Sequence, residues 1–183
     1  KYIKHDFNKG VQFASNTGYN YAKGKYVAFV GDDDCWSDVQ KLKEQVKVFE
    51  NDVLKKYGIV TTDVKMITKS GSYKKNITKP NNLVKHILRR NSIIYGSAAL
   101  LRSDVFKEVG KFSENLPKGT DSYVFRRIIL LGYDVLFIEK DMINYHFDND
   151  DNMTKLTEKS VTLSIISQLY KLNKYNQILK LFP

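Results

Sequence analysis

Apolar residues follow two different periods along this chain, and segments of the two kinds alternate. Short continuous apolar runs such as Tyr26–Val30 favour buried strands, because β-branched and aromatic side chains pack well on a pleated sheet. Spacings of three and four residues instead predict an amphipathic helix over residues 38–51, with Lys43 and Lys47 on its solvent face. The apolar positions of that predicted helix are Val39, Leu42, Val46 and Phe49.

The same patterns predict elements along the rest of the chain. Further helices are expected at residues 11–22, 83–88, 103–110, 121–131 and 161–172, and further strands at 1–5, 58–62, 134–138 and 142–147. Residues 64–78 are expected to form a hairpin that turns at 69–72. Strands that alternate with helices in this way predict an α/β fold, with a mixed, mostly parallel sheet flanked by helices.

Composition indicates a globular domain. The chain has 183 residues, of which 42% are hydrophobic, and this is enough apolar matter for one core. The single cysteine, Cys35, excludes an internal disulfide framework and favours a reducing compartment, so we expect a cytoplasmic protein. No uncharged apolar run approaches the roughly 18 residues that would span a membrane.

The formal net charge of +10 indicates anionic partners or a strongly solvated surface. Basic residues are spread along the whole chain in runs of at most two, as at Arg126–Arg127. Because no recognisable nucleic-acid-binding module accompanies them, nucleic acid is not an expected partner. General solubility, or attraction to a membrane surface, remains as an explanation of the charge.

Three adjacent carboxylates, Asp32, Asp33 and Asp34, follow the predicted strand at 26–30. Adjacent aspartates repel one another, and the carboxyl end of a strand in an α/β sheet is where ligands usually lie. A divalent cation with a phosphate ligand would suit these oxygen donors, whereas the Cys35 thiolate is a poor ligand for such a cation. The alternative is a solvated acidic turn.

Several short motifs occur in an order that resembles the family 2 glycosyltransferases with the A-type nucleotide-sugar fold. The resemblance extends over roughly residues 8–154, and no single motif in it is specific. The motifs are Asn8-x-Gly10, Ala14–Gly18, Gly24–Val30, Asp32–Trp36, Gly96–Arg102, Val109–Phe112, Thr120-Asp121 with Arg127, and Tyr145-His146 through Met153-Thr154. It implies a catalytic domain over residues 1–154, followed by a C-terminal helical extension over 155–183.

The resemblance also implies a reaction. A sugar would pass from a nucleotide diphosphate sugar to a glycan or lipid-linked acceptor in a single inverting displacement, in the service of cell-envelope polysaccharide synthesis. Mn²⁺ or Mg²⁺ would offset the charge of the departing diphosphate, with Asp33 as the main ligand and Asp34 and His146 as further ligands. Asp121 would be the general base. A helix N-cap is the alternative role for Asp121, and a surface imidazole is the alternative for His146.

The remaining residues implied by the resemblance would bind the nucleotide sugar. They are Asp32, Asp34, Asn16, Trp36 and Arg127. Trp36 has an alternative as an ordinary core tryptophan, and Arg127 as a residue of the helix surface. The resemblance also implies peripheral contact with the inner face of the cell membrane.

Departures from the family pattern give a second hypothesis. Almost nothing precedes the Asn8 motif, where the family usually has a strand, a loop and a helix that bind the base, so we expect either a truncated chain or an incomplete nucleotide pocket. Gly31 stands at the family's first aspartate, Ser15 replaces a frequent arginine, and Thr120 replaces a glutamate. The alternative function is therefore a degenerate, non-catalytic domain that binds a sugar nucleotide or serves as a scaffold.

Overall fold

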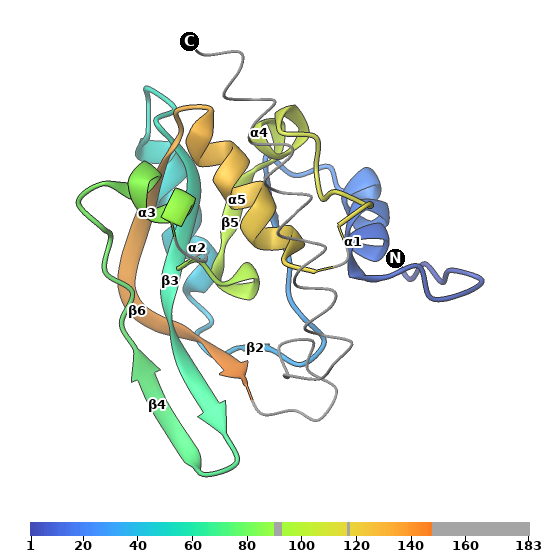
Figure 1. The fold of residues 1–183 in the computed structure, drawn as a ribbon, viewed down its shortest axis with the longest axis horizontal. Coiled ribbons are helices and arrows are strands. Elements are labelled where there is room, and N and C mark those ends of the chain that lie inside the picture. The colour runs from blue at the N-terminus through green and yellow to red at the C-terminus, as the bar shows by residue number, and fades with distance from the viewer. Residues whose placement is uncertain (90–92, 117, 148–183) are drawn as a thin grey trace.

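The computed structural model describes residues 1–89, 93–116 and 118–147 (Figure 1). Its elements are α1 (Val11–Tyr21), β1 (Tyr26–Ala28), β2 (Cys35–Trp36), α2 (Lys41–Asn51), β3 (Tyr57–Thr68), β4 (Gly71–Lys75), α3 (Leu83–Arg89), the 3₁₀ helix η1 (Gly96–Ala98), β5 (Leu100–Arg102), α4 (Ser103–Glu108), α5 (Thr120–Leu130) and β6 (Asp134–His146). The expected helix at 161–172, the extension over 155–183 and the Met153-Thr154 motif lie outside the described residues.

One sheet contains all six strands, in the order β1-β5-β3-β6-β2, with β4 paired to β3. This confirms a mixed α/β sheet flanked by helices. The expectation of a mostly parallel sheet is corrected, because β3 and β6 form the only parallel pair among the described strands. Apolar patterns identify strands but carry no information about strand direction, which is decided by the connections between them.

Helices cover both faces of the sheet, with α5 and α2 on opposite sides (Figure 1). Successive residues of a strand point to opposite faces, and the core divides accordingly. Ile59 and Leu101 belong to a large cluster with α4 and α5, whereas their neighbours Val60 and Leu100 pack against Phe49 of α2. Strands β3 and β5 are thus buried on both sides where they cross the centre of the sheet.

Two strands are longer than the apolar runs indicated. The separate strands expected at 58–62 and 64–68 are one strand, β3, and those expected at 134–138 and 142–147 are one strand, β6. The paired register between β3 and β6 contains shifts, including one between Thr62 and Asp63, which explains how polar positions are accommodated inside continuous strands. The strand expected at 1–5 is wrong, because those residues form no strand.

Helix α2 turns an unexpected face toward the core. It begins at Lys41 rather than at residue 38, and its buried residues are Lys41, Gln45 and Phe49. Val39 is 94% exposed and Leu42 is 38% exposed, so only part of the predicted apolar stripe is buried. The polar groups of Lys41 and Gln45 are tolerated inside because they bond to one another and to backbone carbonyl groups.

A buried ion pair joins β5 to the turn after α2. Arg102 Nη2 lies 3.0 Å from Asp52 Oδ2, and both side chains are less than a tenth exposed. Arg102 Nε also donates to the Tyr57 carbonyl at 2.9 Å, while Asp52 accepts hydrogen bonds from the Lys56 and Tyr57 N–H groups. These additional bonds satisfy both ions, which is the condition under which a buried pair is stable.

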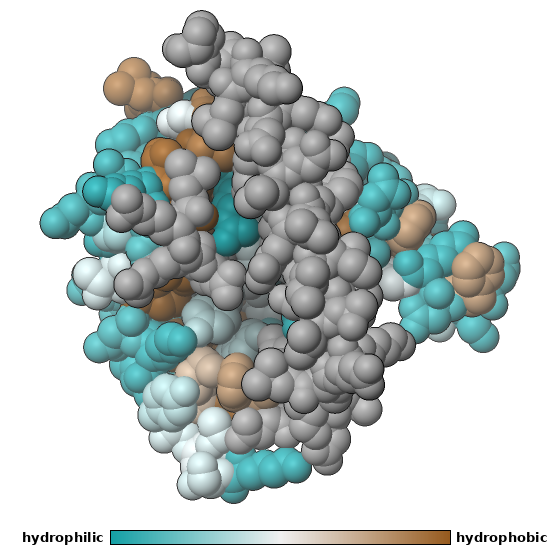
Figure 2. All heavy atoms as spheres, in the orientation of Figure 1, coloured by the Kyte–Doolittle hydropathy of each residue, from teal (hydrophilic) through white to brown (hydrophobic). Residues whose placement is uncertain are grey.

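Hydrophilic residues cover most of the coloured surface on the face seen in Figure 2. The edge strand β4 is exposed at all five positions and projects with the end of β3 beyond the rest of the sheet (Figure 1). Within the described part of the chain, the helices are too short or too polar to cross a bilayer.

Candidate active site

The acidic loop lies between β1 and β2, beside the end of β6. Strand β2 pairs with β6 in antiparallel register, with Cys35 opposite Asn144. Residues immediately before Cys35 therefore run alongside those immediately after Asn144. The contact is direct, because the His146 N–H donates to Asp34 Oδ1 at 3.4 Å. Sheet topology thus brings residues 112 positions apart in sequence into one site.

The 3₁₀ helix η1 holds the acidic loop through Ser97. The Ser97 hydroxyl accepts a hydrogen bond from the Gly31 N–H at 3.0 Å and donates one to Asp34 Oδ2 at 2.5 Å. The Ser97 carbonyl accepts from Trp36 Nε1 at 3.0 Å. Three points along residues 31–36 are therefore attached to one buried serine, so the loop is anchored independently of any ligand.

Asp121 lies in the first turn of α5, next to η1. The N-cap residue is Gly119, in the left-handed conformation, so the N-cap alternative for Asp121 is wrong. Asp121 Oδ1 instead accepts from the Ser122 N–H at 2.6 Å. A Cβ atom on Gly96 would lie 3.2 Å from Asp121 Oδ2, which means that the carboxylate packs directly on the glycine.

Tyr145 lies within electrostatic range of carboxylates from both regions. Burial raises the pKa of its phenol to about 12, and the charges of Asp34 and Asp121 add to the effect, followed by Tyr95 and then Asp33. The rings of Tyr145 and Tyr95 pack edge to face, with centroids 4.8 Å apart. The acidic loop and Asp121 are therefore close enough to act on the same molecule.

The acidic loop offers two carboxylates of the kind that bind a divalent cation. Burial raises the pKa of the Asp34 carboxyl, the Ser97 hydrogen bond opposes this, and the charge of Asp33 raises it further. Bound positive charge would relieve that cost. Mg²⁺ is commonly held by one or two carboxylates together with substrate phosphates, so Asp33 and Asp34 fit such an ion.

The structure gives less support to His146 as a metal ligand than the resemblance implied. The structure places its backbone N–H, rather than its ring, on Asp34. Among the described residues, no group of three or more His, Cys, Asp or Glu side chains is arranged to hold a metal ion. A ligand role for the His146 ring stays a prediction.

The predicted nucleotide-binding residues are divided between two regions. Trp36 and Asp34 belong to the anchored loop, and Asp32 is exposed beside them. Asn16 is buried in α1, where its amide bonds to the Phe112 backbone and to Glu114. Arg127 lies against Gly110 and over the Tyr123 ring. The structure therefore does not bring Asn16 and Arg127 to the acidic loop, and their contact with a nucleotide stays a prediction.

The sequence did not indicate that a buried lysine lies over the Trp36 ring. Lys41 is 1% exposed, and its ammonium group lies 4.5 Å from the centre of the Trp36 ring. Burial lowers the pKa of Lys41 to about 8. Its hydrogen bond to Gln45 Oε1, at 2.9 Å, orients the Gln45 amide toward the carbonyl groups of Val60 and Ala98. The sequence signal for this contact was the i, i+4 spacing of Lys41 and Gln45, which places both side chains on the same face of the helix.

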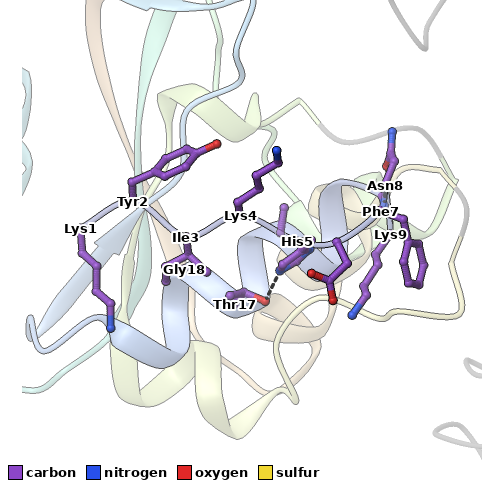
Figure 3. Close-up of a pocket in the computed structure, with 13 residues that line it drawn as sticks. Lys1, Tyr2, Ile3, Lys4, His5, Phe7, Asn8, Lys9, Thr17 and Gly18 are labelled. Carbon is purple, nitrogen blue, oxygen red and sulfur yellow. Dashed lines mark hydrogen bonds between the residues drawn. The ribbon is translucent and has the colours of Figure 1, made fainter.

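A groove of about 710 Å³ lies elsewhere, between the N-terminal residues 1–9 and α1 (Figure 3). Figure 3 shows His5 bonded across it to Thr17, with Nε2 3.0 Å from the hydroxyl. Neither the acidic loop nor Asp121 lines this groove. It is therefore separate from the site formed around η1.

The known proteins that this chain resembles are glycosyltransferases. The family model described as glycosyl transferase family 2 matches residues 1–110. An uncharacterized glycosyltransferase of Methanocaldococcus jannaschii is 25% identical over 162 residues, which are 86% of this chain and 54% of that protein. The chain thus spans about half the length of this curated relative.

Solved structures share the fold at low sequence identity. The mannosyltransferase PcManGT from Pyrobaculum calidifontis, in complex with GDP-Man and Mn²⁺, has a TM-score of 0.58 at 15% identity, over 82% of this chain and 40% of that one. S. aureus TarS 1-349 in complex with UDP has a TM-score of 0.58 at 16% identity, over 76% and 40% respectively. These similarities confirm the fold class, a mixed α/β sheet of the A-type glycosyltransferase kind.

Proposed function

The chain belongs to glycosyl transferase family 2, and on that basis we propose that it takes part in moving a sugar from a nucleotide diphosphate sugar to a glycan or lipid-linked acceptor. The reaction is a single inverting displacement that depends on Mn²⁺ or Mg²⁺. GDP-Man with Mn²⁺, and UDP, are the ligands of two proteins with the same fold, which supports a donor of this class.

One observation carries the proposal: adjacent residues of η1 contact the acidic loop and Asp121. Ser97 bonds to Asp34, and Gly96 packs on the Asp121 carboxylate. A transferase needs two acidic regions on opposite sides of the transferred sugar, one for the diphosphate and one for the acceptor. Two carboxylates that shared a single solvated turn would not meet that need.

Each region has its own part in the reaction. Asp33 and Asp34 would hold the divalent cation, which supplies positive charge for the departing diphosphate. Asp121 takes the proton of the acceptor hydroxyl as that oxygen attacks the anomeric carbon. Its Oδ1 is held by the Ser122 N–H, so the carboxylate is oriented before the acceptor arrives. No covalent intermediate is required in an inverting displacement.

Charge supports the proposed acceptor side. With a net charge of +10, the chain is attracted to anionic surfaces such as the inner face of a cell membrane. A lipid-linked acceptor and a role in cell-envelope polysaccharide synthesis are compatible with that attraction. We place the protein in the cytoplasm, in peripheral contact with the membrane.

One observation favours a second candidate, a non-catalytic domain that binds sugar nucleotides or serves as a scaffold. A Cβ atom at Gly31 would lie 2.8 Å from Asp33 Oδ1. A side chain at this position would require the Asp33 carboxylate to shift, and the loop carries none where the family often has its first aspartate. A site that has lost that carboxylate could retain nucleotide binding and lose transfer.

Two substitutions separate these candidates. Trp36 is the only tryptophan and is bonded to Ser97, so its fluorescence should report Mn²⁺ with UDP or GDP. Asp33→Asn should abolish that response, whereas Asp121→Asn should retain it and lose sugar transfer by at least about 100-fold. Binding without transfer in the wild-type protein would favour the non-catalytic candidate, and retained transfer in Asp121→Asn would remove Asp121 as the base.

A further inference from the structure

We infer that Tyr145 is a further substrate-binding residue, whose hydroxyl group hydrogen-bonds a hydroxyl of the sugar carried by the nucleotide donor. The inference rests on the proposed function and identifies a contact that the motifs did not indicate. It is drawn from the position of the ring, the state of its hydroxyl group and the charges around it.

The ring of Tyr145 is held in place on three sides. Tyr145 lies at the end of β6, directly opposite Met66 of β3. Its edge-to-face contact with Tyr95 has an interplanar angle of 66°. Both rings pack on a small buried cluster of Val64, Met66, Ala98 and Ile143. A side chain fixed in this way presents its hydroxyl group at a defined point, as a binding residue must.

The Tyr145 hydroxyl differs from those of other packed tyrosines. The hydroxyl groups of Tyr19, Tyr26 and Tyr133 donate to the Ser103 carbonyl, to Glu50 and to Glu108, at 2.8, 2.8 and 3.1 Å. In the described ranges 1–89, 93–116 and 118–147, no residue hydrogen-bonds the Tyr145 hydroxyl. Because partly buried phenols usually have a polar partner, this hydroxyl is available for a ligand.

Charge decides what that ligand is. A phenol is protonated at neutral pH and can donate a hydrogen bond. The residue after Tyr145 bonds to Asp34 through its N–H, and Tyr95, which packs on Tyr145, precedes the glycine that contacts Asp121. The same carboxylates oppose a second anion at this point, which favours a neutral partner over a phosphate oxygen. Asp34 belongs to the diphosphate side of the proposed site and Asp121 to the acceptor side. The group that lies between them during transfer is the sugar.

The test compares donors with and without their sugar. Tyr145→Phe keeps the ring and its packing and removes only the hydroxyl group. In the presence of Mn²⁺, binding of GDP-mannose or UDP-glucose should weaken about three- to tenfold, as expected for one lost hydrogen bond, while binding of GDP or UDP should not change. The measurement is titration calorimetry on the purified protein, with thermal unfolding as a check on folding.

A matched variant and three contrary results complete the test. Tyr73→Phe removes a hydroxyl group from the exposed strand β4 and should leave all four affinities unchanged. Equal weakening with GDP or UDP alone would assign Tyr145 to the diphosphate and overturn the inference. Unchanged binding of the nucleotide sugar in Tyr145→Phe would also overturn it. If the wild-type protein binds none of the four, the proposed function itself fails, and the inference fails with it.

Discussion

The Ser97 hydroxyl donates a hydrogen bond to Asp34 Oδ2 at 2.5 Å while it accepts one from the Gly31 N–H. One side chain of η1 thereby closes the acidic loop across 63 residues of sequence. The bond holds the Asp34 carboxylate in one orientation, which a carboxylate in a solvated turn would not have. Loss of the bond should therefore weaken cation and nucleotide binding more than it lowers the free energy of unfolding.

Ser97→Ala should therefore weaken Mn²⁺-dependent nucleotide binding more than it affects folding. The substitution leaves Asp34 and the Gly31 N–H without this partner, and the free energy of unfolding should fall by about 1 to 2 kcal/mol. Binding measured by Trp36 fluorescence should weaken about tenfold or more. Ser72→Ala, on the exposed strand β4, is the matched control. Undiminished binding in Ser97→Ala would show that the loop does not depend on η1.

The buried Lys41 predicts a rise of stability in alkaline solution. Its pKa is lowered to about 8 by burial, whereas the unfolded chain has the ordinary value of about 10.4, so the unfolded state binds more protons between these limits. This group's contribution to the free energy of unfolding therefore rises from pH 8 to about pH 10.4, by on the order of 2 to 3 kcal/mol.

Lys41→Met tests that assignment, because methionine retains the aliphatic packing and removes the charge. The measurement is denaturant unfolding of both proteins at several pH values, with Lys43→Met, which is exposed on the same helix, as the control. The difference in the free energy of unfolding between wild type and Lys41→Met should change with pH. The corresponding difference between wild type and Lys43→Met should not. A difference that stays constant from pH 7 to 10 would refute the assignment.

Two glycines should respond to alanine in opposite directions. A Cβ at Gly58 would lie 2.6 Å from Ile128 Cγ2 and 2.9 Å from Tyr133 Cβ, where β3 packs on α5. Gly58→Ala should therefore destabilise the protein by about 1 to 3 kcal/mol through overpacking. Gly18 lies inside α1 with nothing within 4 Å of its added Cβ, so Gly18→Ala should stabilise by about 0.5 to 1 kcal/mol. Thermal unfolding of the pair measures both effects, and equal shifts would contradict the packing argument.

Removing only one member of the Arg102–Asp52 ion pair should destabilise the protein more than removing both. Arg102→Met leaves the Asp52 carboxylate buried without its cation and should lower the free energy of unfolding by about 3 to 5 kcal/mol. The double variant Arg102→Met, Asp52→Asn should recover part of that loss, since no uncompensated charge remains. A double variant less stable than the sum of the single changes would contradict this account.

The same pair predicts acid sensitivity. Burial alone would raise the pKa of Asp52, but hydrogen bonds from the Tyr57 and Lys56 N–H groups and from Arg102 lower it overall. A carboxyl group with a lowered folded pKa contributes stability above its unfolded value of about 3.9, and that stability is lost as the pH falls through the folded value. Asp52→Asn should therefore reduce the dependence of stability on pH below about 4, as measured by unfolding in acid.

Local sequence patterns predicted where helices and strands form better than they predicted which residues those elements pack against. The helix at 11–22 and the hairpin around residues 69–72 were found because their signals are contained in a few neighbouring residues. The inner face of α2 was not found, because Lys41 and Gln45 are polar and are buried only where Trp36, Val60 and Ala98 are brought to them. Tyr145 stood in the Tyr145-His146 motif without a role of its own, because its position relative to Asp34 and Asp121 depends on the fold.

The sequence alone indicated the family, most of the helices, and Asp33, Asp34 and Asp121 as candidates, because motif residues keep their order along the chain. Only the tertiary structure decided that Ser97 holds Asp34, that Gly96 admits the Asp121 carboxylate, and that Tyr145 lies within electrostatic range of both regions. These relationships depend on the pairing of β2 with β6 and on the position of η1. Both are set by contacts between residues about 60 to 110 positions apart, which no local pattern records.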